Sequence, residues 1–207
     1  MDNYLEDGED GVWKRINPNN IWPLDKLILS RKLGYVCGPV GLRVPKPGWY
    51  IVRPCVNMMG LGLGAQKVWL EKTTYHLPVG HFWCEFFTGR HISLDYAYGL
   101  PKLCVEGFKS NDTFTRWDSW IKVDDFPAME KCLGFPKILD EFIHWPEINC
   151  EFIGSKLIEV HFRPNPDFTE GMTEFIPVWE GQSTDPPEGY SYRPCPDLHG
   201  RVGAFIK

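Results

Sequence analysis

Two strand-like runs joined by a glycine-rich loop constrain this sequence most strongly. The segment GWYIVRPCVNMMGLGLGAQKVWLEK, residues 48–72, places Gly60, Gly62 and Gly64 at alternate positions. Such glycines allow positive φ and let successive N–H groups converge on an anion. Arg53, at the end of the first run, would offer that anion a permanently charged fork. The pattern predicts a β-hairpin flap over a phosphate, with a plain hairpin and a surface ion pair at Arg53 as the alternative.

The loop differs from two widespread phosphate-binding motifs. The dinucleotide fingerprint opens a helix, whereas AQKVWLEK carries the β-branched and aromatic alternation of a strand. The P-loop requires Gly-Lys followed by Ser or Thr, and the sequence contains no such tripeptide. A strand, a glycine loop and a second strand lying over a triphosphate therefore remain as the functional interpretation.

The composition is that of a folded protein with a sizeable core. Of 207 residues, 43% are hydrophobic and 24% are charged, which is ordinary for a globular chain. The net charge of −5 argues against a nucleic-acid-binding protein, because that affinity comes from clustered Lys and Arg. No apolar run approaches the roughly 18 residues of a membrane span, and the acidic N-terminus differs from a signal peptide. We expect a cytoplasmic protein with no membrane or nucleic-acid partner.

The cysteines are scattered, and no two of them form a CxxC pair. An odd number of such residues suits reduced thiols better than a disulfide framework or a zinc site. We expect most of them to pack as small core hydrophobes. The seven are Cys37, Cys55, Cys84, Cys104, Cys132, Cys150 and Cys195.

The segment IWPLDKLILSRKLGY, residues 21–35, predicts a helix near the N-terminus. Pro23 suits its first turn and Gly34 its C-terminal end. Its expected apolar stripe is Leu24, Leu27 and Ile28. A Pro- and Gly-punctuated connector then leads to the strand that ends at Arg53.

Residues 81–87 and 91–98, HFWCEFF and HISLDYAY, predict a second hairpin. A three-residue turn over 88–90 would place Glu85 opposite Ser93. Alternation divides the second run into an apolar face of Ile92, Leu94, Tyr96 and Tyr98 and a polar face of His91, Ser93 and Asp95. One face of this hairpin should pack and the other should face a polar partner.

Residues 149–162, NCEFIGSKLIEVHF, predict a further hairpin that turns at Gly154 and Ser155. Glu159 and His161 share one face of its second strand, because side chains alternate along a strand. A three-residue turn would pair Glu151 with Glu159, whereas a two-residue turn would pair residue 150 with Glu159. Two adjacent carboxylates repel unless a cation lies between them, so the first register predicts a metal site. A solvated strand face is the alternative.

The remaining segments complete an α+β pattern. Residues 124–143 predict two short helices broken at Gly134, and the Pro-rich tail predicts short strands and loops that wrap the domain. We expect a polar N-terminal segment over 1–22, a catalytic domain over 23–168 and a C-terminal extension over 169–207. Helix, antiparallel strands, helix and strands in this order indicate an α+β arrangement of two small lobes around a cleft.

Taken in order, these pieces resemble the ATP-grasp superfamily of ATP-dependent carboxylate–amine ligases. The resemblance covers residues 25–168. The family's "DK" helix and connector are similar to DKLILSRKLGYVCGPVGLRVP, and its strand and glycine flap are similar to YIVRP followed by GLGLGA. Its "vEefi-G-E" segment is similar to CEFFTGRHISLDY. Its metal segment is similar to NCEFIGSKLIEVHFRPNPDF. Four motifs in the same order at plausible spacing are more specific than any one of them.

The sequence departs from the family pattern at four places. Arg53 stands where most members have lysine, as in a branch found in phages and other mobile elements. His91 and His161 replace an acid and an asparagine. Little chain precedes Lys26, so the family's usual leading domain is expected to be absent or reduced, and a homodimer would be one way to complete the cleft.

The resemblance implies roles for individual residues. The nucleotide-binding set would be Lys26, Arg53, Gly60, Gly62, Gly64, Glu85, Phe86, Phe87 and His91, with main-chain groups of 85–88 holding adenine and His91 near the ribose. The ligands of Mg²⁺, or of Mn²⁺ in its place, would be Glu151, Glu159 and His161. Imidazole suits softer metals better than Mg²⁺, so His161 could touch phosphate instead. The catalytic set would be Arg53, Arg163 and Lys26, with Arg163 steadying the acceptor carboxylate or the transferred phosphoryl group.

The resulting functional hypothesis is a ligase that uses ATP to join a carboxylate to an amine through an acyl phosphate. As the branch resemblance suggests, the substrate would be a peptide or protein end, and a viral member would act in the host cytoplasm. A non-catalytic nucleotide-binding module, such as a viral assembly or regulatory protein, is the alternative. A structural α+β protein without a ligand is a third.

Overall fold

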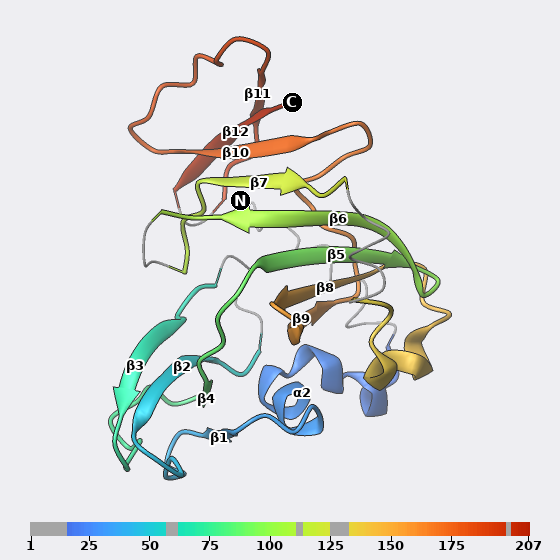
Figure 1. Ribbon diagram of the computed structural model, residues 1–207. Helices are drawn as coiled ribbons and strands as arrows, with labels where there is room; N and C mark the ends of the chain where they lie inside the picture. The colour runs from blue at the N-terminus through green and yellow to red at the C-terminus, as the bar shows by residue number, and fades with distance from the viewer. Residues whose placement is uncertain (1–15, 57–61, 111–113, 125–132, 198–199) are drawn as a thin grey trace, which may run out of the picture.

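The computed structural model describes residues 16–56, 62–110, 114–124, 133–197 and 200–207. Within these ranges the chain forms a small and a large β-sheet, with a short helix between them (Figure 1). All neighbouring strands are antiparallel. The predicted α+β class with two lobes of antiparallel sheet is therefore confirmed.

The small sheet contains four strands in the order β1-β4-β2-β3. They are β1 Cys37–Pro39, β2 Gly48–Pro54, β3 Gln66–Leu70 and β4 His81–Glu85. The predicted hairpin on either side of the glycine loop is present as β2 and β3, with Val52 paired to Gln66. One face carries a compact apolar cluster that includes Tyr50, Val52 and Trp83. Residues 57–61, which include Gly60, lie outside the described ranges.

The large sheet contains eight strands in the order β11-β12-β10-β7-β6-β5-β8-β9. They are β5 His91–Ala97, β6 Leu100–Phe108, β7 Ser119–Lys122, β8 Ile148–Ile153, β9 Lys156–His161, β10 Glu174–Trp179, β11 Ser191–Pro194 and β12 Arg201–Ile206. The tail does more than wrap the domain, because β10 pairs with β7 and so extends the sheet by three strands.

The hairpin predicted between residues 81–87 and 91–98 is absent. Strand β4 pairs with β1 and β2 in the small sheet, whereas β5 pairs with β6 and β8 in the large one. Glu85 therefore does not face Ser93, whose partners are Val105 and Glu151. The turn-like sequence does not form a hairpin, because each of the two strands pairs with other strands in its own sheet. Residues 86–90 instead form a linker between the sheets.

The predicted N-terminal helix is shorter and differently phased. A 3-10 turn, η2 Trp22–Leu24, precedes α2 Lys26–Lys32, because the Asp25 side chain accepts a hydrogen bond from Ile28 N–H and caps the helix there. Of the expected stripe, Leu24 is buried but Ile28 is 39% exposed. Leu29 takes the core position instead. The expected end holds, since Gly34 adopts a φ of 74°.

Strands β8 and β9 settle the register that the sequence left open. The turn has two residues, Gly154 and Ser155, and Ile153 pairs with Lys156. A bulge between Glu151 and Phe152 then shifts the register, so Glu151 pairs with Glu159 despite the short turn. The two carboxylates are direct cross-strand neighbours.

The segment predicted as two helices over 124–143 is described only in part. Residues 125–132 lie outside the described ranges, and after Gly134 the chain forms a 3-10 helix, η3 Lys137–Phe142, instead of an α-helix. Leu139 and Phe142 of this turn pack into the core beneath the large sheet. Among the described helices, none combines the length and apolarity needed to cross a membrane.

The main core lies on one face of β5, β8 and β9. Its members include Ile92, Leu94, Tyr96, Cys150 and Val160, against which η3 and α2 pack. Because side chains alternate, this apolar face fixes which residues of the same strands point the other way. The opposite face carries the polar residues of the candidate site.

Candidate active site

A cavity of about 750 Å³ lies between the two sheets. The small sheet contributes Arg53 and Cys84 to its wall, and β8 and β9 contribute Glu151 and Glu159. Lys26, the first residue of α2, completes the junction. The strand that ends at Arg53 and the strand that carries Glu159 thus open on one shared space.

The floor of the cavity is a polar patch built from three neighbouring strands. Strand pairing sets Ser93 beside Glu151 and Glu159 in one row, and Asp95 beside Asn149 and His161 in the next. The two rows belong to one face, because their members are two residues apart on each strand. The sequence predicted the faces of β5 and β9 correctly, but Tyr98 lies beyond β5 at a φ of 52° and is 65% exposed.

Two cations converge on Glu159 from different elements. Lys26 Nζ lies 3.2 Å from Glu159 Oε2, and Arg53 Nη1 lies 3.8 Å from the same oxygen. The main chain fixes Lys26, whose N–H donates to Cys55 O at 2.7 Å just after β2. Arg53 Nη2 donates to Ile158 O at 2.7 Å. These contacts tie the helix, the small sheet and the acidic hairpin together at one point.

Arg53 is buried without full satisfaction of its donors. Its side chain is 10% exposed, and its Nε has no hydrogen-bond partner among the described residues. The 3.8 Å contact to Glu159 is too long for a hydrogen bond. Since one carboxylate is shared by Lys26 and Arg53, this corner of the cavity carries excess positive charge and suits an anion.

Both acidic residues are ionised at neutral pH. Burial would raise the pKa of Glu159, but Lys26, His161 and Arg53 together hold that pKa well below its usual range. Burial and Glu159 also act to raise the pKa of Glu151, but the hydrogen bond with His91 and the charge interactions with His91 and His161 together lower it. His91 Nε2 lies 3.1 Å from Glu151 Oε2, and His161 Nε2 lies 3.3 Å from Glu159 Oε1. Each carboxylate therefore has a histidine neighbour.

The donor set suits a hard divalent cation. Glu151 and Glu159 present ionised carboxylates to the cavity, and Mg²⁺ takes one or two carboxylates together with water and substrate phosphate oxygens. Within the described part of the chain, no three His, Cys, Asp or Glu side chains are already arranged as a metal site. His161 contacts Glu159, so its placement as a ligand stays a prediction.

The linker between the sheets leaves its main chain available. Phe86, Phe87 and Thr88 line the cavity. The N–H and C=O groups of 86–89 form no hydrogen bond with other described residues. Main-chain donors and acceptors at a cavity edge can recognise the polar edge of a planar ligand. Glu85 itself is not part of the wall: its carboxylate accepts from Val36 N–H at 3.0 Å.

The described end of the glycine loop lines the cavity from the side of the small sheet, through Gly62, Leu63 and Ala65. Gly62, with a φ of 66°, lines the wall, and a Cβ added there would lie 2.5 Å from Phe114 O. Only glycine therefore allows this close approach to the chain that follows β6. Gly64 has a φ of 73° but packs near Pro54 and is not a lining residue.

One wall was missed by the sequence analysis. Trp117 and Trp120 lie edge-on to His91, with ring centroids at 4.6 and 5.5 Å. Lys109 lies 5.4 Å from the Trp117 ring. The only advance signal was the high aromatic content, 14%, together with the spacing of WDSW. Nothing in those letters indicates that they meet His91 across the sheet.

A second missed feature is the loop after β9. Asn165 N–H donates to Asp95 Oδ1 at 2.9 Å, and Asn149 Nδ2 donates to the same oxygen at 2.7 Å. Burial raises the pKa of Asp95 to about 6, although these hydrogen bonds act to lower it. The loop also carries Arg163 and Asp167, and both line the cavity. Asp95 thus anchors the loop from beneath.

The cysteines take no part in this chemistry. The described ones are free, as expected, and Cys132 lies outside the described ranges. Cys84 lines the cavity, but burial raises the pKa of its thiol to about 12. A thiol with that pKa stays protonated at neutral pH and is a poor nucleophile.

No family model matches the sequence. No curated protein matches it at a significant level. Several solved structures resemble part of the chain at low identity, and three of them are described below.

An Archaeoglobus fulgidus protein described as a member of the ATP-grasp superfamily is 19% identical, with a TM-score of 0.42 over 69% of this chain and 46% of its own. The ATP-grasp ligase PsnB, solved with a minimal precursor, is 11% identical, with a TM-score of 0.44 over 72% and 53%. The D-alanine–D-alanine ligase of Bacillus anthracis is 13% identical, with a TM-score of 0.36 over 69% and 58%. The match spans about half the length of these chains.

Proposed function

We propose that this chain is an ATP-grasp-like enzyme that joins a carboxylate to an amine at the expense of ATP. One observation carries the proposal: Arg53 and Lys26 meet the acidic hairpin of Glu151 and Glu159 in a single cavity between two sheets. Cations at one corner and ionised carboxylates on the floor are what a metal–triphosphate complex needs. The linker main chain supports a nucleobase site, and Gly62 supports a cover over the phosphates.

The proposed reaction needs charge and position more than a side-chain nucleophile. A carboxylate and an amine form a salt at neutral pH, because the carboxylate oxygen is a poor leaving group. Transfer of the γ-phosphoryl group to the carboxylate gives an acyl phosphate and ADP, and the amine then displaces orthophosphate. Arg53, Lys26 and Arg163 would stabilise the negative charge that collects during transfer.

Glu151 and Glu159 would hold the divalent cation, which supplies neutralisation of phosphate charge when bound. His91 and His161 would keep these carboxylates oriented through their contacts at 3.1 and 3.3 Å. The cover formed around Gly62 and Phe114 would exclude the water that hydrolyses an acyl phosphate.

The test is turnover of Mg·ATP with a panel of free amino acids and dipeptides as acceptors. We expect acceptor-dependent release of orthophosphate with ADP as the coproduct. AMP with pyrophosphate would indicate an acyl adenylate and overturn the proposed chemistry. Glu159→Gln should lower turnover by at least about 100-fold. Glu147→Gln, at an exposed carboxylate outside the cavity wall, should leave it unchanged.

A non-catalytic nucleotide-binding module is the second candidate, and one observation favours it. Glu159 is already engaged by Lys26, Arg53 and His161, so its charge is largely balanced by the protein. In such a module Mg·ATP would raise the melting temperature, no acceptor would stimulate phosphate release, and Glu159→Gln would leave partner binding intact. That combination of results would favour the module over the ligase.

A further inference from the structure

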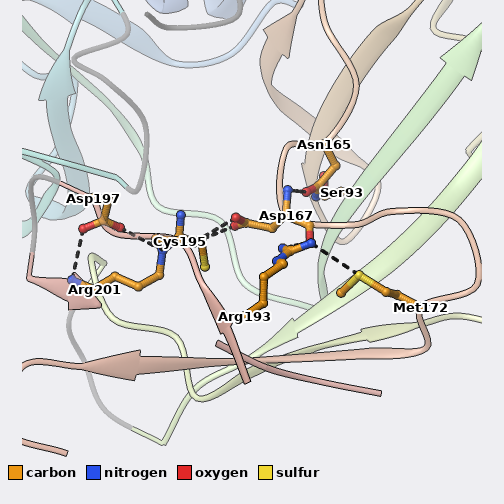
Figure 2. A network of polar contacts seen from close by, with 8 residues as sticks. All are labelled: Ser93, Asn165, Asp167, Met172, Arg193, Cys195, Asp197 and Arg201. Atoms are coloured by element: carbon orange, nitrogen blue, oxygen red, sulfur yellow. Dashed lines mark hydrogen bonds and ion pairs between the residues drawn. The ribbon is translucent and has the colours of Figure 1, made fainter. Parts of the chain in front are cut away.

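The cavity wall also includes a cluster of charged residues supplied partly by the C-terminal strands. Arg201, the first residue of β12, lines this part of the wall together with Asp167 and Asp197 (Figure 2). Nothing in the proposed nucleotide site requires these residues. The cluster therefore needs an explanation of its own.

Protein contacts fix the Arg201 guanidinium on two of its nitrogens. Nη1 donates to both oxygens of Asp167 at 2.9 Å. Nε donates to Cys195 O at 3.1 Å and lies 3.2 Å from Asp197 Oδ2. The side chain is only 12% exposed, so the planar group is held in one orientation.

The third guanidinium nitrogen of Arg201 is available to donate a hydrogen bond to a ligand. Nη2 has no hydrogen-bond acceptor among the described residues, and it is not one of the buried polar atoms that lack a partner. It is therefore accessible, on a residue that lines the cavity. A fixed guanidinium with one accessible edge is a preorganised donor for an oxyanion.

The charges of the cluster do not oppose an anion. Arg193 Nη2 donates to the main-chain oxygen of Asp167, which brings a second arginine to the cluster (Figure 2). Arg163 also lines the cavity. Arg193 and Arg201 therefore offset the charges of Asp167 and Asp197, so the cluster presents no net negative charge that would oppose a carboxylate.

We propose that Arg201 binds a non-reacting carboxylate of the amine substrate, as carried by a free amino acid or by a peptide with a free C-terminus. The assignment rests on the proposed ligase function and identifies its acceptor class. It gives the C-terminal strands a direct role: β12 supplies the anchor, and the loop after β9 holds it through Asp167. The reacting amine would then lie between this anchor and the phosphate end of the cavity.

The first experiment uses the wild-type protein and two probes that differ only in charge. N-acetylglycine carries one carboxylate, and N-acetylglycinamide carries none. Ligands this small bind in the millimolar range at best. We expect N-acetylglycine to shift the Arg201 side-chain ¹⁵N resonance saturably, and at least about tenfold more tightly than the amide. Equal binding of both probes, or no response up to tens of millimolar, would overturn the proposal.

The second experiment uses variants. Arg201→Gln should weaken N-acetylglycine binding at least about tenfold and leave the affinity for a non-hydrolysable ATP analogue with Mg²⁺ within about twofold. Arg116→Gln removes the same charge from an arginine that lies over the Trp179 ring and is not part of the cavity wall, and should change neither affinity. If Arg201→Gln does not fold, the comparison of the two probes on wild type still decides.

The two proposals fail separately. If the wild-type protein binds N-acetylglycine through Arg201 but not the ATP analogue, the nucleotide function is wrong and the carboxylate subsite stands. If it binds the analogue but prefers the amide probe, the subsite is wrong and the nucleotide function stands. Tighter binding of glycinamide than of N-acetylglycine would assign this end to an ammonium group instead, through Asp167 and Asp197.

Discussion

The two ends of the cavity hold their arginines in opposite ways. Arg53 makes one short contact to a carbonyl oxygen and a long one to Glu159, and its Nε is unsatisfied. Arg201 makes a paired contact with Asp167 at 2.9 Å and further contacts through Nε. The two arginine side chains are thus similarly buried, but the charge of Arg53 is only loosely compensated by its neighbours, whereas the charge of Arg201 is closely compensated.

This difference in charge compensation indicates what each end of the cavity can contribute to ligand binding. A buried charge with incomplete compensation is unfavourable in the free protein, and an anionic ligand relieves that cost. Arg53 is therefore suited to bind phosphate strongly. A charge already neutralised by aspartates gains less from a ligand, but it directs the ligand in a fixed geometry. Arg201 is therefore suited to select and orient.

Replacement of Arg53 should give the largest effect. Arg53→Met removes the charge from the phosphate end, and we expect the affinity for a non-hydrolysable ATP analogue with Mg²⁺ to fall by at least about 100-fold. Arg53→Lys restores the charge without the planar fork and should stay within about tenfold of wild type. Isothermal titration calorimetry measures both.

Arg116→Met is the matched control, because it removes a cation that lies outside the cavity wall. Its affinity for the analogue should equal that of the wild type. An Arg53→Met variant that is folded by circular dichroism and binds the analogue as well as wild type would contradict the contrast between the two arginines. The phosphate end would then depend on Lys26 alone.

The sequence predicted local elements better than their partners. Alternation predicted β2, β3, β5, β8 and β9, since it reports which face of a strand is buried. It failed at residues 88–90, because a turn-like tripeptide in an extended linker has the same letters as a hairpin turn. It could not predict the bulge beside Glu151, which depends on packing across the hairpin.

The residues of the candidate site likewise fall into those that the sequence predicted and those that only the fold brings together. Lys26, Arg53, Glu151 and Glu159 were selected from the order of motifs, and the structure gathers them at one cavity. Glu85 and Gly64 were selected with them but do not line it. Asp95, Trp117 and Asn165 reach the site only through strand pairing and loop packing between distant segments. No local pattern in one sequence contains that information.

Gly62→Ala should give an intermediate effect, confined to the end that holds Arg53. The added Cβ would lie 2.5 Å from Phe114 O, so residue 62 cannot keep its present position at the cavity wall. We expect kcat/KM for ATP to fall about tenfold, through a higher KM and a higher fraction of unproductive ATP hydrolysis. Steady-state assays of ADP release with and without acceptor measure both quantities.

Gly181→Ala controls for backbone strain. Gly181 also has a positive φ, 84°, but a Cβ added there would meet nothing within 4 Å. Both variants carry a similar strain of roughly 1 kcal/mol for alanine in the left-handed region. Equal kinetic effects of the two would mean that strain, and not the contact with Phe114, is responsible, and the loop would lose its role as a cover.

Asp95→Asn should give the smallest effect and should act on the other end, through the loop that carries Asp167. The folded pKa is raised from 3.8 to about 6, chiefly by burial. Between about pH 4 and pH 6 the folded protein therefore retains a proton that the unfolded chain has released, so the free energy of unfolding falls as the pH rises through this window. Asparagine removes that dependence.

Urea unfolding at pH 4 and pH 7 tests this point. The stability of Asp95→Asn relative to wild type should rise by about 2–3 kcal/mol between the two pH values, which corresponds to a shift of about two pKa units. The titration of Glu151 and Glu159 does not affect this comparison. Their pKa values are lowered, so their contributions to the pH dependence of the free energy of unfolding fall below about pH 4.5. The exposed variant Glu188→Gln should change nothing in this window, because Glu188 is not among the groups that shift the pKa of Asp95.

The effect of Asp95→Asn on turnover should be a few-fold loss at pH 7, because the neutral amide accepts the Asn165 N–H more weakly than a carboxylate does. The loss should appear in KM for the acceptor and not in the affinity for nucleotide, since the loop leads to Asp167 and Arg201 and not to Arg53. A loss in nucleotide affinity alone would show that the two ends of the cavity are not held independently, and the contrast between the two arginines would no longer describe the site.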